Sequence, residues 1–245
     1  MAVDTPQPVP VGDDAPILEV MRTMRAMRRL KPDPVPRELI EELIEAATWA
    51  PSGGNLQGFS FVVVDDRDVI ARLAPIWRKT AGWYIAMQDQ PPPHMAQEQL
   101  NALIAALRFQ AEHFPEIPAL IICCYELRSS VQRQVKSWRR VLGAYRGLPW
   151  RDALTTLHHL PRFIRRGEAA SIYPGVQNLL LTARAKGLGA TLTTWHLAFE
   201  DEVRAVLGIP RHVHTYALVP IGWPRGRLGT VVRRPAREAI HWNRW

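Results

Sequence analysis

The sequence is poor in cysteine, with two among 245 residues, and it lacks a long apolar run. Cys123 and Cys124 are adjacent in an expected strand, where successive side chains point to opposite faces, so a disulfide between them is not expected. The longest apolar run, residues 119–125, is far shorter than the ~18 residues of a membrane-spanning helix. These absences favour a cytoplasmic protein whose cysteines are buried packing residues.

Recognisable hydrolase, metal and dinucleotide motifs are also lacking. Ser52 has no glycine two residues before it, as a nucleophile elbow requires. His212 and His214 could share one strand face, but two histidines without a third ligand are more often structural. The pair Gly187 and Gly189 follows an expected helix and precedes an expected strand, the reverse of a dinucleotide fingerprint. The sequence therefore assigns no catalytic side chain and no metal ligand.

Charge is unevenly distributed along the chain. The formal net charge is +8, and residues 128–166 contain ten Lys or Arg and one acid, Asp152, so the rest is nearly neutral. This segment could be a lid or a dimer-wrapping insertion, or could recognise an acidic or aromatic substrate; contact with nucleic acid or a membrane is the least favoured alternative. Residues 1–15 have neither a basic start nor an apolar core, and they are expected to form a disordered arm.

Apolar periodicity predicts alternating helices and strands. Helices are expected over residues 17–29, 36–48, 96–113, 172–186 and 200–207, from 67 onward, and in fragments at 131–142 and 153–160. Strands are expected at 59–64, buried on both faces, and at 119–125, 189–195 and 215–221. Residues 77–114 could form a mobile cover over a site, and the tail 226–245 is expected to lie across other elements or a second subunit.

The stretch 51–58 separates the second helix from the first strand. Pro51 closes the helix, and Gly53 and Gly54 allow main-chain N–H groups to approach a ligand closely. Ser52, Asn55 and Gln57 add polar side chains. The alternative is a plain turn with glycines for geometry.

Arginines could serve a phosphorylated ligand, because guanidinium groups bind phosphate in a bidentate manner. Arg25 and Arg28 belong to the predicted first helix, and Arg233 and Arg234 to the tail. The alternative for any one of them is an ordinary solvated basic surface.

Three motifs occur in the order found in the FMN-dependent nitroreductase family, which the chain resembles. They are the segment 24–64 with its Pro-Ser-Gly-Gly-Asn-Leu-Gln loop, the stretch 177–181 followed by Gly-Leu-Gly-Ala-Thr at 187–191, and Arg-Arg-Pro at 233–235. The resemblance fails over about residues 76–116 and 127–168.

The resemblance implies an α+β fold with a central mixed, mainly antiparallel sheet flanked by helices, in an interlocked homodimer with two flavin sites at the interface. Residues 16–245 would form one FMN-binding domain with inserts near 76–116 and 127–168. The implied reaction transfers hydride from NAD(P)H through FMN to a nitroaromatic, quinone or similar conjugated acceptor. A dehalogenase, a flavin-degrading relative and a non-catalytic flavin-sequestering protein are the alternatives.

The resemblance also implies the cofactor site. Arg28 would lie near the flavin pyrimidine edge, Arg25 and Arg233 at the phosphate, and the backbone of 190–192 near N5. The family often has two arginines followed by serine where this chain has Met24-Arg25-Ala26, so either Arg22 or Arg25 could hold the phosphate. The acceptor and the choice among NADH, NADPH and a deazaflavin donor stay open. The predicted cofactor-binding residues are Arg25, Ala26, Met27, Arg28, Pro51, Ser52, Gly53, Asn55, Gln57, Gly189, Ala190, Thr191, Leu192, Arg233 and Arg234.

Overall fold

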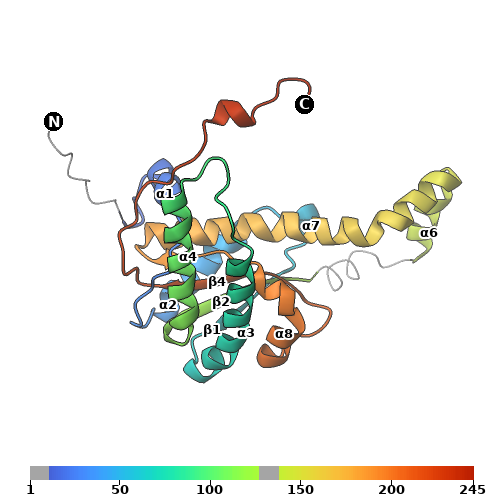
Figure 1. The fold of residues 1–245 in the computed structure, drawn as a ribbon. Helices are drawn as coiled ribbons and strands as arrows, with labels where there is room; N and C mark the ends of the chain where they lie inside the picture. Colours follow the sequence, from blue (N-terminus) through green and yellow to red (C-terminus); the bar gives the residue numbers. More distant parts are fainter. Residues whose placement is uncertain (1–10, 127–137) are drawn as a thin grey trace.

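The computed structural model describes residues 11–126 and 138–245 and is organised around a four-stranded sheet (Figure 1). The strands are β1 (Phe59–Val64), β2 (Ala119–Tyr125), β3 (Gly189–Ala190) and β4 (His214–Gly222), in the spatial order β1-β2-β4-β3. All strand pairs of the described residues are antiparallel, with Phe59 opposite Tyr125 and Ala119 opposite Ile221. Every residue of β2 is buried, because this strand is paired on both edges and covered on both faces.

Helices cover both faces of the sheet and create two cores. One core contains α2 (Arg37–Thr48) and the C-terminal part of α7 (Trp150–Ala185); the other contains α3 (Arg67–Ala86) and α8 (Glu200–Leu207). The helix α4 (Gln97–Glu112) lies beside α3 (Figure 1). The strand β2 serves both cores, since Cys123 belongs to the first and Cys124 to the second. The cysteines are unpaired, and burial raises the pKa of the Cys124 thiol to about 12.

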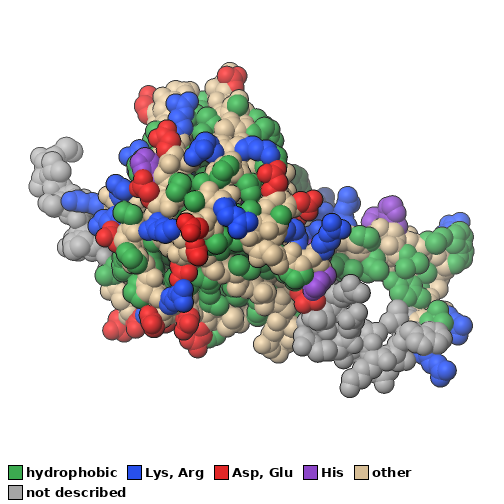
Figure 2. Space-filling model, turned by 90° about the horizontal axis from the view of Figure 1, so that it is seen from below, with side chains coloured by type: hydrophobic (Ala, Val, Ile, Leu, Met, Phe, Trp, Pro, Cys, Tyr) green, Lys and Arg blue, Asp and Glu red, His purple; other side chains and the backbone are tan. Residues whose placement is uncertain are grey.

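The helix α7 has two different halves. Its C-terminal half packs closely on α2, where a Cβ on Gly175 would lie 2.7 Å from the Ala47 carbonyl oxygen. Its N-terminal half projects from the body and carries α6 (Trp138–Arg146) at its end (Figure 1). We call α6 and residues 150–166 the helical arm; Figure 2 shows hydrophobic and basic side chains along it. The arm therefore adds surface to the molecule without adding to either core.

The predicted first helix is too long. The helix α1 (Ile17–Thr23) ends before Met24, and the chain then continues in an extended conformation. The Met27 amide donates to the Ala190 carbonyl at 3.0 Å, the Arg225 amide donates to the Arg29 carbonyl at 2.9 Å, and the Lys31 amide donates to the Trp223 carbonyl at 2.7 Å. These bonds to distant residues replace the helical ones, so Arg25 and Arg28 lie on an extended segment.

Other boundaries also differ from the predictions. The strand β1 lies at the edge of the sheet, so it is not buried on both faces, and Val63 is 38% exposed. The predicted strand 189–195 is reduced to β3 and one bridge from Thr193 to Leu218. The helical fragment 153–160 and the helix 172–186 are parts of the continuous α7, which contains Pro161 and Pro174. Short 3₁₀ helices occur at Gly53–Asn55, Phe114–Glu116, Trp195–Phe199 and Ala236–Ala239.

Both ends of the chain contact the body. Residues 1–10 of the expected disordered arm lie outside the described residues, but the Gly12 amide donates to the Ala185 carbonyl and Asp13 pairs with Lys186 at 2.5 Å. At the other end, residues 223–231 run antiparallel to 22–31, so the first part of the predicted tail lies across another element, whereas residues 232–245 are exposed and extend away from the body (Figure 1). Residues 127–137, where part of the fragment 131–142 was predicted, also lie outside the described residues. No described helix has the length and apolarity to cross a bilayer.

Candidate functional site

A cavity of about 180 Å³ lies between α3, α4, the extended segment at Arg28 and the stretch that follows β3. We call it the Arg28 cavity. Its lining residues are Arg28, Trp77, Tyr84, Leu107, Gln110, Thr191, Leu192, Thr193, Thr194 and Trp195.

Backbone and hydroxyl contacts join two sequence-predicted parts of this site. Besides the Met27–Ala190 backbone bond, the Thr191 hydroxyl donates to the Met27 carbonyl at 2.9 Å. The absence of a side chain at Gly189 makes room for Met27, because a Cβ at position 189 would lie 2.5 Å from Met27 Cγ. The structure therefore brings Met27 and Arg28 together with residues 189–192, across more than 160 positions of sequence.

Aromatic rings form one wall of the Arg28 cavity. The centroid of Trp195 lies 4.3 Å from that of Tyr84 and 5.5 Å from that of Trp77. Trp77 in turn stacks on Phe114 of the core at 5.2 Å, which fixes its ring. A wall of this kind suits a planar, conjugated ligand.

Several buried polar atoms at this cavity lack a hydrogen-bond partner among the described residues. They are Arg28 Nε, Trp77 Nε1, and Nε2 and Oε1 of Gln110. Gln110 is only 2% exposed. Burial lowers the pKa of Arg28, the charge of Arg25 lowers it further and Tyr84 raises it, yet a guanidinium stays charged. Since unpaired buried polar groups cost about 1–3 kcal/mol each, they indicate a site that a polar ligand or water completes.

The glycine loop lies elsewhere in the chain. The Gly53 amide donates to the Ser171 hydroxyl of α7 at 3.1 Å, and the Gln57 amide donates to the Ser52 hydroxyl at 3.1 Å. Asn55 and Gln57 have positive φ angles of 52° and 49° and exposed side chains joined at 3.1 Å. Such backbone strain at an exposed loop favours a functional role. None of residues 51–57, including Pro51, lines the Arg28 cavity.

The predicted phosphate ligands lie outside the Arg28 cavity. The Val231 amide donates to the Arg22 carbonyl at 3.0 Å, so the tail passes the end of α1 just before Arg233 and Arg234. Arg25, Arg233 and Arg234 are exposed, as is Ala26. Arg22 pairs with Glu19, so Arg25 is the better-placed candidate for an anion.

Of the ten lining residues, sequence reasoning named Arg28, Thr191 and Leu192 and missed the other seven. Trp77, Tyr84, Leu107 and Gln110 come from α3 and α4, in the segment 76–116 that was expected only to cover a site. The one available signal was the aromatic content around Trp77 and Tyr84. Gln110 carries no motif, and its position depends on how α4 packs.

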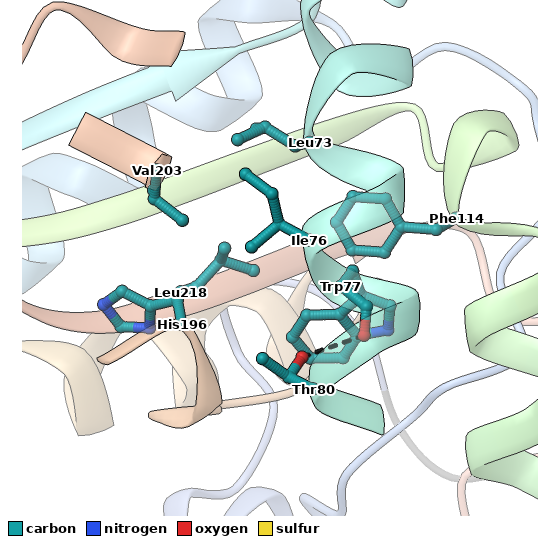
Figure 3. Close-up of a pocket in the computed structure, with 8 residues that line it drawn as sticks. All are labelled: Leu73, Ile76, Trp77, Thr80, Phe114, His196, Val203 and Leu218. Atoms are coloured by element: carbon teal, nitrogen blue, oxygen red, sulfur yellow. Dashed lines mark hydrogen bonds between the residues drawn. The ribbon is translucent and has the colours of Figure 1, made fainter. Parts of the chain in front are cut away.

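A second cavity, which we call the His196 cavity, has about 10 Å³, which is room for one water molecule. Figure 3 shows His196 facing Leu218 and Val203, with Trp77 and Phe114 across the space. Neither ring nitrogen of His196 has a partner among the described residues. Burial lowers the pKa of His196 to about 4, with Glu200 opposing and Arg204 adding to the shift, so this histidine is neutral near pH 7.

Glu168, His214 and Tyr216 form a hydrogen-bonded group elsewhere in the molecule. Glu168 accepts hydrogen bonds from the Tyr216 hydroxyl and from His214 Nδ1, the latter at 2.6 Å. Thus His214 has a structural partner, and the side chain of His212 is 49% exposed. Among the residues that the structure describes, no three His, Cys, Asp or Glu side chains are grouped to hold a metal ion.

Comparison with known proteins adds the family. A family model described as the nitroreductase family matches residues 21–223, which include both sides of the Arg28 cavity. The chain belongs to the nitroreductase family. Membership makes it an oxidoreductase of a flavoprotein family and agrees with the expected nitroreductase-like fold.

The proteins that this chain resembles carry different enzyme names. The chain is 28% identical to an NADH dehydrogenase of Thermus thermophilus over 219 residues, covering 89% of this chain and 91% of that one. It is 42% identical to an iodotyrosine deiodinase of Danio rerio over 210 residues, covering 84% of this chain but 59% of that one. A solved iodotyrosine deiodinase bound to FMN and 3-iodo-L-tyrosine has a TM-score of 0.64 at 17% identity, covering 94% of this chain and all of that one (100%). This last likeness concerns the fold alone.

Proposed function

We propose that the protein is an FMN-dependent oxidoreductase that takes hydride from NAD(P)H and passes it to a nitroaromatic, a quinone or a similar conjugated acceptor. The observation that carries this proposal is the buried cation of Arg28, with unpaired donors beside it, in a cavity walled by aromatic rings. Family membership supports the flavin and the reaction class.

The residues present fit the polar end of a flavin ring. Arg28 can donate to ring acceptors and stabilise negative charge, and Trp195 and Tyr84 offer faces for stacking. The cavity volume of about 180 Å³ is below the ~300 Å³ at which pockets for whole drug-sized ligands begin. It suits one end of a three-ring system, with the remainder outside.

Bound FMN would supply the hydride chemistry, and the chain would supply orientation and electrostatics. The amides of Thr191 and Thr193 donate to Pro220 and Leu218 of β4, so the intervening Leu192 amide points away from β4. We infer that this amide donates near flavin N5, as the resemblance implies. No catalytic side chain is required, because an acceptor can take its proton from solvent.

A homodimer is part of this proposal, because the glycine loop does not reach the Arg28 cavity within one chain. We infer that Ser52–Gln57 of one subunit completes the site of the other, together with the phosphate contacts of Arg25 and Arg233. The helical arm supports a protein contact, since Trp150, Leu154 and Leu157 are 68%, 58% and 52% exposed at helical spacing. The two buried, unpaired cysteines suit the cytoplasmic setting proposed with it.

Mixed dimers test the shared site. Arg28→Leu and the pair Ser52→Ala with Asn55→Ala should each lower FMN binding at both sites of a dimer. A mixed dimer of the two variants, isolated with two affinity tags, would place both defects in one site and leave the other intact. We expect about one FMN per mixed dimer, by symmetry. If each subunit used its own loop, both sites of the mixed dimer would be defective and FMN would not be recovered.

The activity has a direct test. The purified protein should be yellow, release FMN on denaturation, and bleach when NADH or NADPH is added without oxygen. A reduced deazaflavin is the third donor to compare, and menadione and nitrofurazone are suitable acceptors. A colourless protein that binds no added FMN would refute the proposal. Bound FMN that no donor reduces would instead favour a flavin-sequestering protein.

Reductive dehalogenation is a second candidate, favoured by the iodotyrosine deiodinases among the relatives. The same reduced cofactor would serve a halogenated phenol in place of a nitro compound. Halide release from 3-iodotyrosine and 2-iodophenol under anaerobic reduction distinguishes the two. Consumption of free reduced FMN with a change in its ring would point to the flavin-degrading alternative.

A further inference from the structure

The unpaired groups of the Arg28 cavity form a specific donor and acceptor set. Arg28 Nε and Trp77 Nε1 can only donate, whereas the Gln110 amide offers a donor, Nε2, and an acceptor, Oε1. Gln110 is 2% exposed on α4 and lines the same space as Arg28 and Trp77. The residues that line the cavity thus carry three kinds of donor and one acceptor without a partner among the described residues, beside a volume of about 180 Å³.

The ligand that fits this set presents acceptors on either side of one donor. The pyrimidine end of an oxidised flavin has this pattern, because N1, O2 and O4 accept and the N3–H group between the two carbonyls donates. A carboxamide is complementary to an imide edge, since it can donate to a carbonyl while it accepts from the adjacent N–H. A phosphate or a nitro group, by contrast, offers no donor and would leave Gln110 Oε1 unpaired.

We propose that Gln110 binds the imide edge of the flavin, with Oε1 accepting from N3–H and Nε2 donating to an adjacent carbonyl, while Trp77 Nε1 donates to a further ring acceptor. The proposal rests on the flavin function above and adds two residues, from α3 and α4, that the predicted cofactor site did not include. It also explains why a buried amide with no internal partner stands on α4. In the absence of a ligand, Gln110 costs stability that binding recovers.

Two flavins test the contact with N3. Apo-protein is titrated with FMN and with 3-methyl-FMN, which has no N3–H, and binding is followed by flavin fluorescence. The wild type should bind 3-methyl-FMN at least ~10-fold more weakly than FMN, because the methyl group removes the donor and occupies its space. Gln110→Leu should bind FMN roughly 10-fold more weakly than the wild type and discriminate between the two flavins by less than about twofold.

Thermal unfolding of the apo-proteins separates binding from structure. Gln110→Leu should melt at the same temperature as the wild type or higher, because leucine removes two unpaired polar atoms at similar volume. Gln97→Leu is the matched control, since Gln97 lies exposed on the same helix and its side chain donates to Asn101. It should leave both flavin affinities unchanged.

Trp77→Phe provides an independent variant that keeps the aromatic wall and removes one donor. It should weaken the binding of FMN and of 3-methyl-FMN by the same factor, roughly threefold to tenfold, and preserve the preference for FMN. Unchanged discrimination in Gln110→Leu, or a loss of FMN binding accompanied by a lower melting temperature, would overturn the role of Gln110. If the wild type binds neither flavin, the flavin function itself fails, whereas FMN binding without discrimination defeats this inference alone.

Discussion

The two cavities share Trp77 but differ in what they can hold. Both contain buried polar atoms without a partner among the described residues: Arg28 and Gln110 in one cavity, and His196 in the other. The Arg28 cavity has about 180 Å³, whereas the His196 cavity has about 10 Å³ and is lined mostly by apolar side chains. Unpaired polar atoms alone therefore do not mark a binding site. Room for a ligand and a complementary set of donors and acceptors are also needed.

The largest expected effect is on cofactor binding. Arg28→Leu should weaken FMN binding roughly 1,000-fold, or about 4 kcal/mol, because a buried charged donor to the ring is lost. Flavin fluorescence titration of the apo-protein measures this. Arg29→Leu is the control, since Arg29 lies over Phe109 at 5.3 Å and does not line the cavity. An equal loss in both variants would mean that general positive charge, and not the Arg28 cavity, binds FMN.

The burial of His196 should make the stability of the protein depend on pH. Burial lowers the pKa of His196 from 6.5 to about 4, so in acid the unfolded histidine takes up a proton before the folded one. The neutral, buried His196 therefore contributes its full stability above pH 6.5. As pH falls from 6.5 toward 4, the free energy of unfolding should decrease by about 3 kcal/mol. Urea unfolding of the wild type and His196→Leu should diverge by this amount over that range. Parallel pH profiles would show that His196 is protonated or hydrated in the folded protein.

A smaller effect is expected beneath the Arg28 cavity. Gly189→Ala should destabilise the fold by about 2 kcal/mol, because the new Cβ would lie 2.5 Å from Met27 Cγ and 3.0 Å from Leu30 Cδ2. Gly143→Ala on α6 meets nothing within 4 Å and should be neutral or stabilising. Denaturant unfolding compares the two. Equal stability would show that the segment at Met27 shifts freely, which would weaken the case for a preformed site.

The smallest effect concerns the volume of the His196 cavity. Val203→Ile adds one methyl group to a space that holds a single water molecule, so the free energy of unfolding should change by less than about 1 kcal/mol. FMN affinity should stay the same, since Val203 does not line the Arg28 cavity. A large loss of FMN binding would mean that the two cavities are coupled through Trp77.

The sequence predicted those elements whose signals are local. The strands β1 and β2 and the helix α8 begin and end where predicted, because continuous apolar runs and flanking Asp, Gly or Pro residues define them. The resemblance also chose residues that the structure brings together, such as Arg28 with Ala190 and Thr191. Assignment of these residues to the cofactor remains a prediction until FMN binding is measured.

The sequence by itself determined the family and the bounds of β1 and β2, because these follow from short motifs and apolar runs, whereas the role of Arg28 stays a prediction. Only the tertiary structure decided that Met24–Leu30 is extended, that α7 is continuous, and that Gln110 and Trp77 line the same cavity as Arg28. The physical reason is that hydrogen bonds to Ala190 and Arg225, more than 160 positions away, compete with helical bonds at Met27 and Arg29. Likewise, the partners of a buried amide are set by the packing of α4 against α3, which no local pattern encodes.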